Sequence, residues 1–404
     1  MMDENKAPMR TFNVLLLTVF LLSPIGARCS AADLPRLDPM TARMRPEKLA
    51  EIDSLVATAI DEKKMPGCVL LIGRPAGIVW FKAYGNKRVE PESEVMTDDT
   101  VFDLASLTKP LATATSIMKL VEQRKLSLDD TVAKHLPDFA AQGKERITIL
   151  DLMVHRSGLI PDNSIADYSD GPIKAKERLL ALTPIAPLGT KFMYSDVNFM
   201  VLGELVQRVS GQPVDQFARD QIFSPLDMTE TMYLPTDALR QRSAPTEKRD
   251  GQWIQGEVHD PRAFRLEGVA GHAGLFGTAR DLAKYATDAL AGIQHDRSRI
   301  LKQQTWQTMT TPVTIEGPDS KGRQTRDLRG AGWDIRSRYS SNRGTRFSDQ
   351  AFGHGGFTGT VLWIDPGTDL YVVFLSNRVH PNGKGLVNPL AGKICDLAVE
   401  ARME

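Results

Sequence analysis

The stretch that decides the fold is LASLTKPLATATSIMKL, residues 104–120, which contains the pattern Ser-x-x-Lys twice. Ser106 is followed by Lys109, and Ser116 is followed by Lys119. One such pattern is weak evidence of function, because short motifs recur by chance. The place of each pair relative to the helix predicted here therefore decides which pair has a chemical role.

The second pair lies well inside that helix and is interpreted as structural. The apolar stripe of the helix is formed by Leu111, Ala114, Met118 and Val121. We expect the Ser116 hydroxyl to bond back to the carbonyl four residues earlier, and Lys119 to face solvent.

The first pair lies where VFDLAS, residues 101–106, changes into the helix. Pro110 has no N–H to bond the Ser106 carbonyl, which predicts an irregular first turn. Free N–H groups at a helix start favour negative charge, so the Ser106 N–H can help to bind an oxyanion. Lys109 lies one turn further on the same face, and burial there would favour its neutral, basic form. This pattern favours Ser106 as a nucleophile with Lys109 as its base.

Predicted strands lie at both ends of the chain, and predicted helices lie between them. An amphipathic helix over residues 47–64 precedes two β-rich runs, GCVLLIG and GIVWFKAYG, which predict a hairpin. Further strands are predicted in GAGWDIRSR, GTVLWIDP and LYVVFLSN, before a last helix in NPLAGKICDLAVEARM. We expect one antiparallel sheet from both chain ends (about 47–105 and 325–404), terminal helices covering it, and an inserted helical region (about 106–324).

Three motifs occur in a fixed order: FDLASLTKP (102–110), MYSDVNFMVLGELVQRVSG (193–211) and GHGGFTGTVLWIDP (353–366). Together they resemble the three motifs of the serine β-lactamase and penicillin-binding-protein superfamily. They are most similar to the branch that holds class C β-lactamases, D-alanyl-D-alanine carboxypeptidases and related esterases. The resemblance runs from about residue 47 to the C-terminus. It implies a β-lactamase/transpeptidase-like fold (α/β plus all-α) and a serine hydrolase that needs no cofactor and no metal.

The second motif also occurs twice, as Tyr-Ser-Asp at 168–170 and at 194–196. The first copy lies in a polar loop and is interpreted as a solvent turn, whereas the second leads into an apolar helix. By resemblance to the family's Tyr-x-Asn element, Tyr194 would move the proton between Ser106, Lys109 and the leaving group. Asp196 stands where asparagine is usual. A carboxylate there would keep Lys109 charged and shift the role of base toward Tyr194.

The third motif has two copies as well. His272-Ala273-Gly274 is followed by a predicted turn and helix, and His354-Gly355-Gly356 by a predicted strand. The family places this element on the edge strand of the sheet beside the serine, which matches His354. The resemblance implies that the N–H groups of Phe357, after Gly356, and of Ser106 form the oxyanion hole.

The usual third motif is Lys-Thr-Gly, in which lysine and threonine hold a substrate carboxylate. His354 and Gly355 replace both residues, which weakens the case for an efficient β-lactamase. An arginine from another loop, such as Arg265, could replace that contact.

His259, Asp260 and His272 are residue types that bind zinc. The sequence offers no third histidine at close spacing, so we expect these residues to line or brace the cleft without a metal.

The N-terminal residues have the pattern of a signal peptide. Basic residues precede the apolar run VLLLTVFLL (14–22), and small residues follow it, which predicts a signal peptide over 1–32 and a hydrolase domain over 33–404. The chain would then be periplasmic or secreted, and an uncleaved anchor is the alternative.

Two cysteines, Cys68 and Cys395, remain in the chain after residue 32. Whether they form a disulfide stays open.

Composition excludes some partners. Lys+Arg and Asp+Glu each number 50, so nothing indicates a nucleic-acid footprint or a polybasic membrane anchor. We therefore expect an exported monomeric hydrolase that acts on D-amino-acid peptides of the cell wall or on small esters. The alternatives are a class C-type β-lactamase and a penicillin- or peptide-binding protein without turnover.

Overall fold

A nine-stranded antiparallel sheet is the framework of the protein. In a computed structural model of the chain, residues 34–319 and 321–403 are described. The strands are β1 (Gly67–Arg74), β2 (Gly77–Arg88), β3 (Glu94–Val95), β9 (Val313–Pro318), β10 (Gln324–Arg329), β11 (Asp334–Arg336), β12 (Phe352–Gly355), β13 (Thr360–Asp365) and β14 (Leu370–Ser376). Their order is β3-β2-β1-β14-β13-β12-β11-β10-β9.

Strands from the two ends of the chain meet in the middle of this sheet, because β1 pairs with β14. The predicted sheet built from both ends is therefore confirmed. The predicted hairpin is also present, since Arg74 pairs with Gly77 across a two-residue turn. The second group of strands begins at Val313, earlier in the chain than the sequence suggested.

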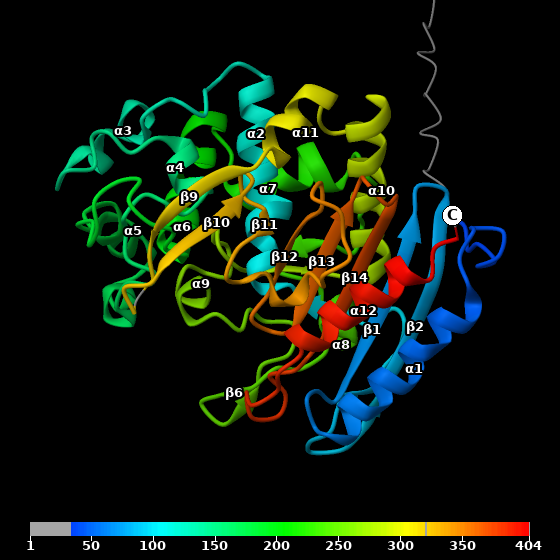
Figure 1. The fold of residues 1–404 in the computed structure, drawn as a ribbon. Helices are drawn as coiled ribbons and strands as arrows, with labels where there is room; N and C mark the ends of the chain where they lie inside the picture. Colours follow the sequence, from blue (N-terminus) through cyan, green and yellow to red (C-terminus); the bar gives the residue numbers. More distant parts are fainter. Residues whose placement is uncertain (1–33, 320, 404) are drawn as a thin grey trace, which may run out of the picture. The chain divides into compact units, whose positions relative to one another are not determined.

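The two terminal helices, α1 (Pro46–Asp61) and α12 (Asn388–Glu400), pack on one face of the sheet (Figure 1). Side chains alternate along a strand, so the even-numbered Leu70 and Ile72 of β1 face these helices, whereas Val69 and Leu71 face the helical region. Cys68 and Cys395 are both buried in the layer beneath α1 and α12, and both are free thiols. The question of a disulfide is thereby answered.

The opposite face of the sheet is covered by the inserted helical region. Its helices are α2 (Thr115–Glu122), α3 (Val132–His135), α4 (Ile149–Met153), α5 (Pro172–Leu180), α6 (Asp196–Ser210), α7 (Val214–Ala218), α8 (Asp237–Arg242), α9 (Pro261–Arg265), α10 (Ala279–His295) and α11 (Gln303–Thr310). Short strands accompany them: β4 (Phe102–Asp103), β5 (Met232–Tyr233) and β8 (Leu275–Gly277) form one small sheet, and β6 (Lys248–Arg249) and β7 (Gln252–Trp253) another. His272-Ala273-Gly274 is thus followed by β8 before helix α10, and not directly by a turn and helix.

The helix that carries both Ser-x-x-Lys pairs begins irregularly, as predicted. A π-helical turn, Lys109–Ala114, precedes α2, and such turns are frequent at functional sites. Ser116 is fully buried, but its hydroxyl has no hydrogen-bond partner among the described residues. The expected back-bond to Ala112 is wrong: the helix departs from the regular i to i−4 pattern here, and the Thr115 N–H bonds to the carbonyls of Ala112 and Pro110. Lys119 does not simply face solvent, since it donates to the Ile300 carbonyl at 2.6 Å.

No helix of residues 34–319 and 321–403 is long and apolar enough to cross a membrane. The predicted signal peptide lies outside these residues.

Candidate active site

A cleft of about 530 Å³ lies where the end of β12 meets the turn that carries Ser106. The predicted site residues that line it are Ser106, Tyr194, Asp196, His354, Gly356 and Phe357. The remaining one, Lys109, is fully buried behind Ser106 and hydrogen-bonded to it. The structure therefore brings all the predicted site residues together, and His259, Asp260 and His272 also line the cleft.

Ser106 is presented by a sharp backbone turn. Ala105, the preceding residue, has φ of 45°, in the left-handed region that residues with a side chain rarely occupy. Its N–H donates to the buried Asp103 carboxylate at 2.8 Å, which helps to hold this conformation. Ser106 follows within a single 3₁₀ turn, Ala105–Leu107. Strained backbone of this kind is concentrated at functional sites.

The Lys109 ammonium is the centre of the site. Its Nζ donates to Ser106 Oγ at 2.9 Å and to the His272 carbonyl at 3.1 Å. It also forms an ion pair with Asp196 Oδ1 at 2.7 Å, although the angles of this contact do not meet those of a hydrogen bond. Burial works to lower the pKa of Lys109, but Asp196 and Tyr194 outweigh it and hold the pKa above its usual value. Lys109 is thus charged, as the aspartate in the second motif predicted.

Tyr194 is held between two rings just before α6. Its ring centroid lies 4.5 Å from that of His155 and 5.2 Å from that of Tyr339. His155 Nδ1 also accepts the Ser195 N–H at 3.1 Å, so His155 fixes the backbone that carries Tyr194. Burial raises the pKa of Tyr194, against the opposing effect of the Lys109 charge. Tyr194 is therefore a neutral phenol at neutral pH. No sequence motif pointed to a role for His155.

The other Tyr-Ser-Asp copy is not simply a solvent turn. Tyr168 is buried and its hydroxyl donates to Asn163 Oδ1 at 2.8 Å, whereas Ser169 and Asp170 are exposed. No residue of this copy lines the cleft with Ser106.

The third motif lies beside Ser106, but β12 is not an edge strand, because β9, β10 and β11 extend the sheet beyond it. β12 pairs with β11 at one position only, Gly353 opposite Asp334. His354 and Gly355 lie beyond that pair, so this end of β12 faces the cleft much as an edge strand would. Burial, followed by the charges of Arg329 and Lys109, lowers the pKa of His354 well below its usual value. His354 is therefore a neutral imidazole, with Nδ1 2.8 Å from the Gly355 carbonyl.

The loop after β12 is fastened to the serine turn. Thr358 donates to the Asp103 carbonyl at 2.7 Å, and Thr360 donates to the Leu104 carbonyl at 3.0 Å. Gly356 lies so close that a Cβ there would be 2.6 Å from the Leu104 carbonyl oxygen. These contacts place Phe357 at the cleft next to Ser106. Its ring is stacked on that of His259, with 5.4 Å between the two ring centroids. A role for its N–H in an oxyanion hole stays a prediction.

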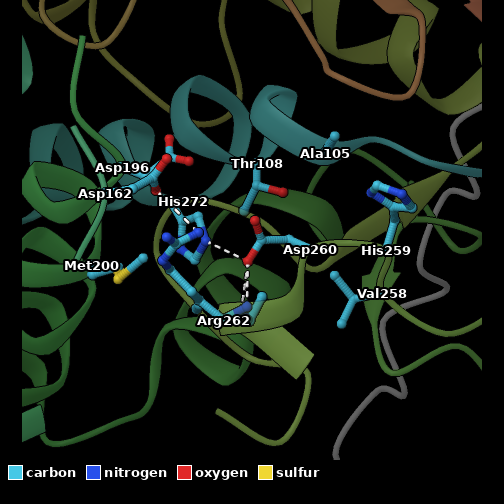
Figure 2. Close-up of polar contacts among 12 residues, drawn as sticks. Ala105, Thr108, Asp162, Asp196, Met200, Val258, His259, Asp260, Arg262 and His272 are labelled. Atoms are coloured by element: carbon cyan, nitrogen blue, oxygen red, sulfur yellow. Dashed lines mark hydrogen bonds and ion pairs between the residues drawn. The ribbon is translucent and has the colours of Figure 1, made fainter. Parts of the chain in front are cut away.

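Acidic and histidine side chains form another wall of the cleft (Figure 2). Asp260 Oδ1 lies 2.9 Å from His272 Nε2 and accepts the N–H groups that begin α9. Burial opposes ionisation of Asp260, but the nearby His272 and those N–H groups hold its pKa below the usual value. Ligand atoms of Asp196, Asp260 and His272 lie within 4.8 Å of one another and could hold a cation. The Lys109 ammonium already balances Asp196, which disfavours a metal there.

The expected arginine is not at the cleft, because Arg265 is exposed at the end of α9 and does not line it. Arg329 and Arg378 line the cleft instead. Sequence reasoning missed Arg329, since it lies in the polar strand QTRDLR, which has no motif or apolar periodicity.

Comparison with known proteins gives a consistent result. The family model described as Beta-lactamase matches residues 52–393. An N-acetylmuramyl-L-alanine amidase of Bacillus subtilis (strain 168) is 32% identical over 375 residues, covering 84% of this chain and 83% of the relative. A protein of Escherichia coli (strain K12), provisionally named a D-alanyl-D-alanine carboxypeptidase, is 33% identical over 406 residues, covering 90% of this chain and 91% of the relative.

Solved structures agree with the fold. A penicillin-binding protein homologue from Caulobacter crescentus is similar with a TM-score of 0.71 at 21% identity, over 89% of this chain and 98% of that one. EstCE1, a hydrolase with promiscuous acyltransferase activity, is similar with a TM-score of 0.68 at 25% identity, over 87% of this chain and 99% of that one.

Proposed function

This chain belongs to the β-lactamase family, and from that premise we propose that it is a serine hydrolase that forms an acyl-enzyme on Ser106. The observation that supports this most strongly is the 2.9 Å hydrogen bond from Lys109 Nζ to Ser106 Oγ, at the bottom of a cleft. A charged lysine there stabilises negative charge that develops on the serine oxygen as it attacks.

The proton balance of the site identifies the base that we propose. Lys109 and Tyr194 are both protonated in the resting site, because their pKa values are both raised. The reactive form has lost one proton and consists of a Tyr194 phenolate beside the Lys109 ammonium. Ser106 Oγ then bonds to the substrate carbonyl carbon while its proton passes to Tyr194. Tyr194 delivers that proton to the leaving amine or alcohol, and the resulting ester on Ser106 is hydrolysed by water with the same base.

We propose amide or ester bonds of cell-wall peptides, or small esters, as the substrates. The names of the relatives support the first class, since one is an N-acetylmuramyl-L-alanine amidase and another is provisionally a D-alanyl-D-alanine carboxypeptidase. EstCE1 supports the second class. A class C-type β-lactamase is less well supported, because His354 and Gly355 stand where the family carries the lysine and threonine that hold a carboxylate.

A panel of substrates tests this proposal on one preparation of the protein. The panel contains nitrocefin, a D-Ala-D-Ala peptide, an N-acetylmuramyl-L-alanine peptide and p-nitrophenyl esters. We expect turnover of an ester or a peptide at a higher kcat/KM than that of nitrocefin. Covalent labelling of Ser106 without turnover of any substrate would favour a penicillin- or peptide-binding protein, and fast cephalosporin hydrolysis would favour a β-lactamase.

We also propose that the protein is exported after cleavage following Ala32, on the basis of the apolar run at 14–22 and the small residues after it. N-terminal sequencing of protein from the periplasm or the medium should give a start near Asp33. A start at Met1 or Met9 on a cytoplasmic protein would contradict the proposal.

A further inference from the structure

His155 follows the end of α4 in an unusual backbone conformation. Its φ is 61°, in the left-handed region, where glycine is the usual residue after a helix. Histidine instead adds a side chain there, and this side chain is 0% exposed. The backbone is fastened in the core, because the His155 N–H donates to the Leu152 carbonyl at 3.2 Å and Asn198 Nδ2 of α6 donates to the same carbonyl at 3.2 Å. His155 is thus a fixed point beside the start of α6.

This residue accepts hydrogen bonds from both sides of Tyr194. Its carbonyl oxygen accepts the Met193 N–H at 2.9 Å, and its Nδ1 accepts the Ser195 N–H at 3.1 Å. The backbone before Tyr194 and the backbone after it are therefore both held by one residue. Any residue at this position has a carbonyl oxygen to offer, whereas the second acceptor requires the imidazole.

The chemical form of the imidazole matches this role. Since Nδ1 accepts a hydrogen bond, the ring proton lies on Nε2, which has no partner among the residues that the structure describes. Burial, followed by the charges of Arg329 and Lys109, lowers the pKa of His155 well below its usual value, so the ring stays neutral. A buried N–H without a partner is costly, and a hydrocarbon ring would pack against Tyr194 without that cost. Packing alone therefore does not explain a histidine here.

The position of Tyr194 matters because of the protons that it is proposed to carry. Both Ser106 and Lys109 interact with its hydroxyl, and Lys109 Nζ lies 5.1 Å from the centre of its ring. A general base must lie within hydrogen-bond reach of the proton that it takes. A displacement of about 1 Å can lower the rate of such a step about 100-fold.

We propose that His155 is a positioning residue for the proton transfers of Tyr194, acting through the Nδ1 acceptor that holds the Ser195 N–H. It does not line the cleft, so it acts on Tyr194 and not on the substrate. This inference rests on the proposed function and extends the site to a residue behind the reacting groups.

Two variants of nearly equal size separate the acceptor from the ring. His155→Asn places Oδ1 at the position of Nδ1, and asparagine tolerates left-handed backbone. His155→Leu has a similar shape but no acceptor. Leucine adopts this backbone elsewhere in the chain, since Leu234 has φ of 49°. Both variants lose the ring, so a difference between them reports the contact with the Ser195 N–H.

The assay is the ratio of kcat/KM for ethyl butyrate to kcat/KM for p-nitrophenyl butyrate, measured on one preparation. Ethoxide needs a proton as it leaves, whereas p-nitrophenolate leaves without one. We expect the ratio to fall about 10- to 100-fold in His155→Leu and to change less than about threefold in His155→Asn, because proton transfer contributes about 10²- to 10⁴-fold to a rate. Partial unfolding lowers both rates alike and leaves the ratio unchanged. An equal ratio in the two variants would overturn the proposal.

His135→Leu is the control for the loss of a histidine. His135 is the last residue of α3, lies 2.8 Å from Asp130 through Nε2 and does not line the cleft. This variant should keep the ratio of the unmodified protein. If His155→Leu does not fold, His155→Ala takes its place, since it also lacks the acceptor and the ring.

A second background tests whether the effect passes through Tyr194. In a Tyr194→Phe protein, His155→Leu should not change the ratio further, because residues that act as one unit are not additive. A further fall there would overturn the proposal.

Hydrogen–deuterium exchange gives a readout without catalysis. The peptide that contains residues 193–195 should exchange faster in His155→Leu than in His155→Asn, and equal exchange would contradict the hold on Ser195. If the unmodified protein hydrolyses neither ester and a fluorophosphonate does not label Ser106, the serine mechanism fails. The exchange result then still decides whether His155 holds this segment.

Discussion

Replacing Asp196 by asparagine should make the protein more active at neutral pH. Asp196 lies 2.7 Å from Lys109 Nζ, and its charge stabilises the protonated forms of both Lys109 and Tyr194. The reactive form proposed above has one proton fewer than the resting site. Without the carboxylate, that proton is lost at lower pH, whichever of the two residues releases it. The rising limb of the pH profile should therefore move toward lower pH.

The distance sets the scale of the effect. At 2.7 Å and an effective dielectric constant of about 20, the gross attraction between the two charges is about 6 kcal/mol. The burial of Lys109 opposes this attraction, and Asp196 is 21% exposed, so solvent screens it further. If only about 1.4 kcal/mol acts on the proton that must leave, the reactive fraction at pH 7 still rises about tenfold. We expect the same factor in kcat/KM, or a shift of the limb by about one pH unit.

The assay is kcat/KM for one p-nitrophenyl ester between pH 5 and pH 10, with background hydrolysis subtracted. Asp170→Asn is the matched control, because Asp170 belongs to the other Tyr-Ser-Asp copy and pairs with Arg178 at the surface. The control should show the unchanged profile. A limb that stays in place or moves to higher pH in Asp196→Asn would refute the reasoning, as would loss of activity at every pH in a folded protein.

Three further substitutions test separate parts of the structure. Ser106→Ala should lower activity by about 10⁴ to 10⁶, the usual loss for a covalent nucleophile, and the fluorophosphonate adduct on the peptide containing residue 106 should disappear in mass spectrometry. Ser116→Ala should keep full activity and leave the melting temperature unchanged or higher, because it removes a buried hydroxyl without a partner among the described residues and gains about 0.5 kcal/mol of helix propensity; a loss of activity would show that the wrong serine was chosen. Asp260→Asn should destabilise the protein at pH 7, as measured by urea unfolding, since the native pKa of Asp260 lies below its unfolded value and the stabilisation is fully present above about pH 4. The difference from the unmodified protein should shrink as the pH falls below that value, and a constant difference down to pH 3 would contradict a role of its charge.

Local patterns predicted most of the framework. The hairpin of β1 and β2 and the amphipathic α1 have strong apolar periodicities, and both lie where the sequence placed them. The strands β9 and β10 were not predicted, because they are mostly polar and expose alternate residues at the sheet margin. The edge position of β12, which the family resemblance implied, is wrong because β11, β10 and β9 extend the sheet beyond it. A strand without an apolar side leaves little trace in a sequence, although it changes the neighbours of every strand beside it.

The site shows the same division between local and distant contacts. Ser106 and Tyr194 lie where a strand or loop changes into a helix, and His354 lies in the short strand β12 just before a glycine-containing turn; short motifs report such places well. His155 bonds to the Ser195 backbone and Arg329 lies over the Phe192 ring, both far away in the chain, and a fully buried arginine is too rare to be expected from a polar strand.

The departures in the third motif are linked to these distant residues. Gly355 has no side chain because the Asn342 amide occupies the space in which a Cβ would lie, and the charge of Arg329 helps to keep His354 neutral. A change of His354-Gly355 to Lys-Thr alone would therefore place a second cation beside Arg329 and a side chain against Asn342. That change should therefore be tolerated only together with compensating changes at Arg329 and Asn342.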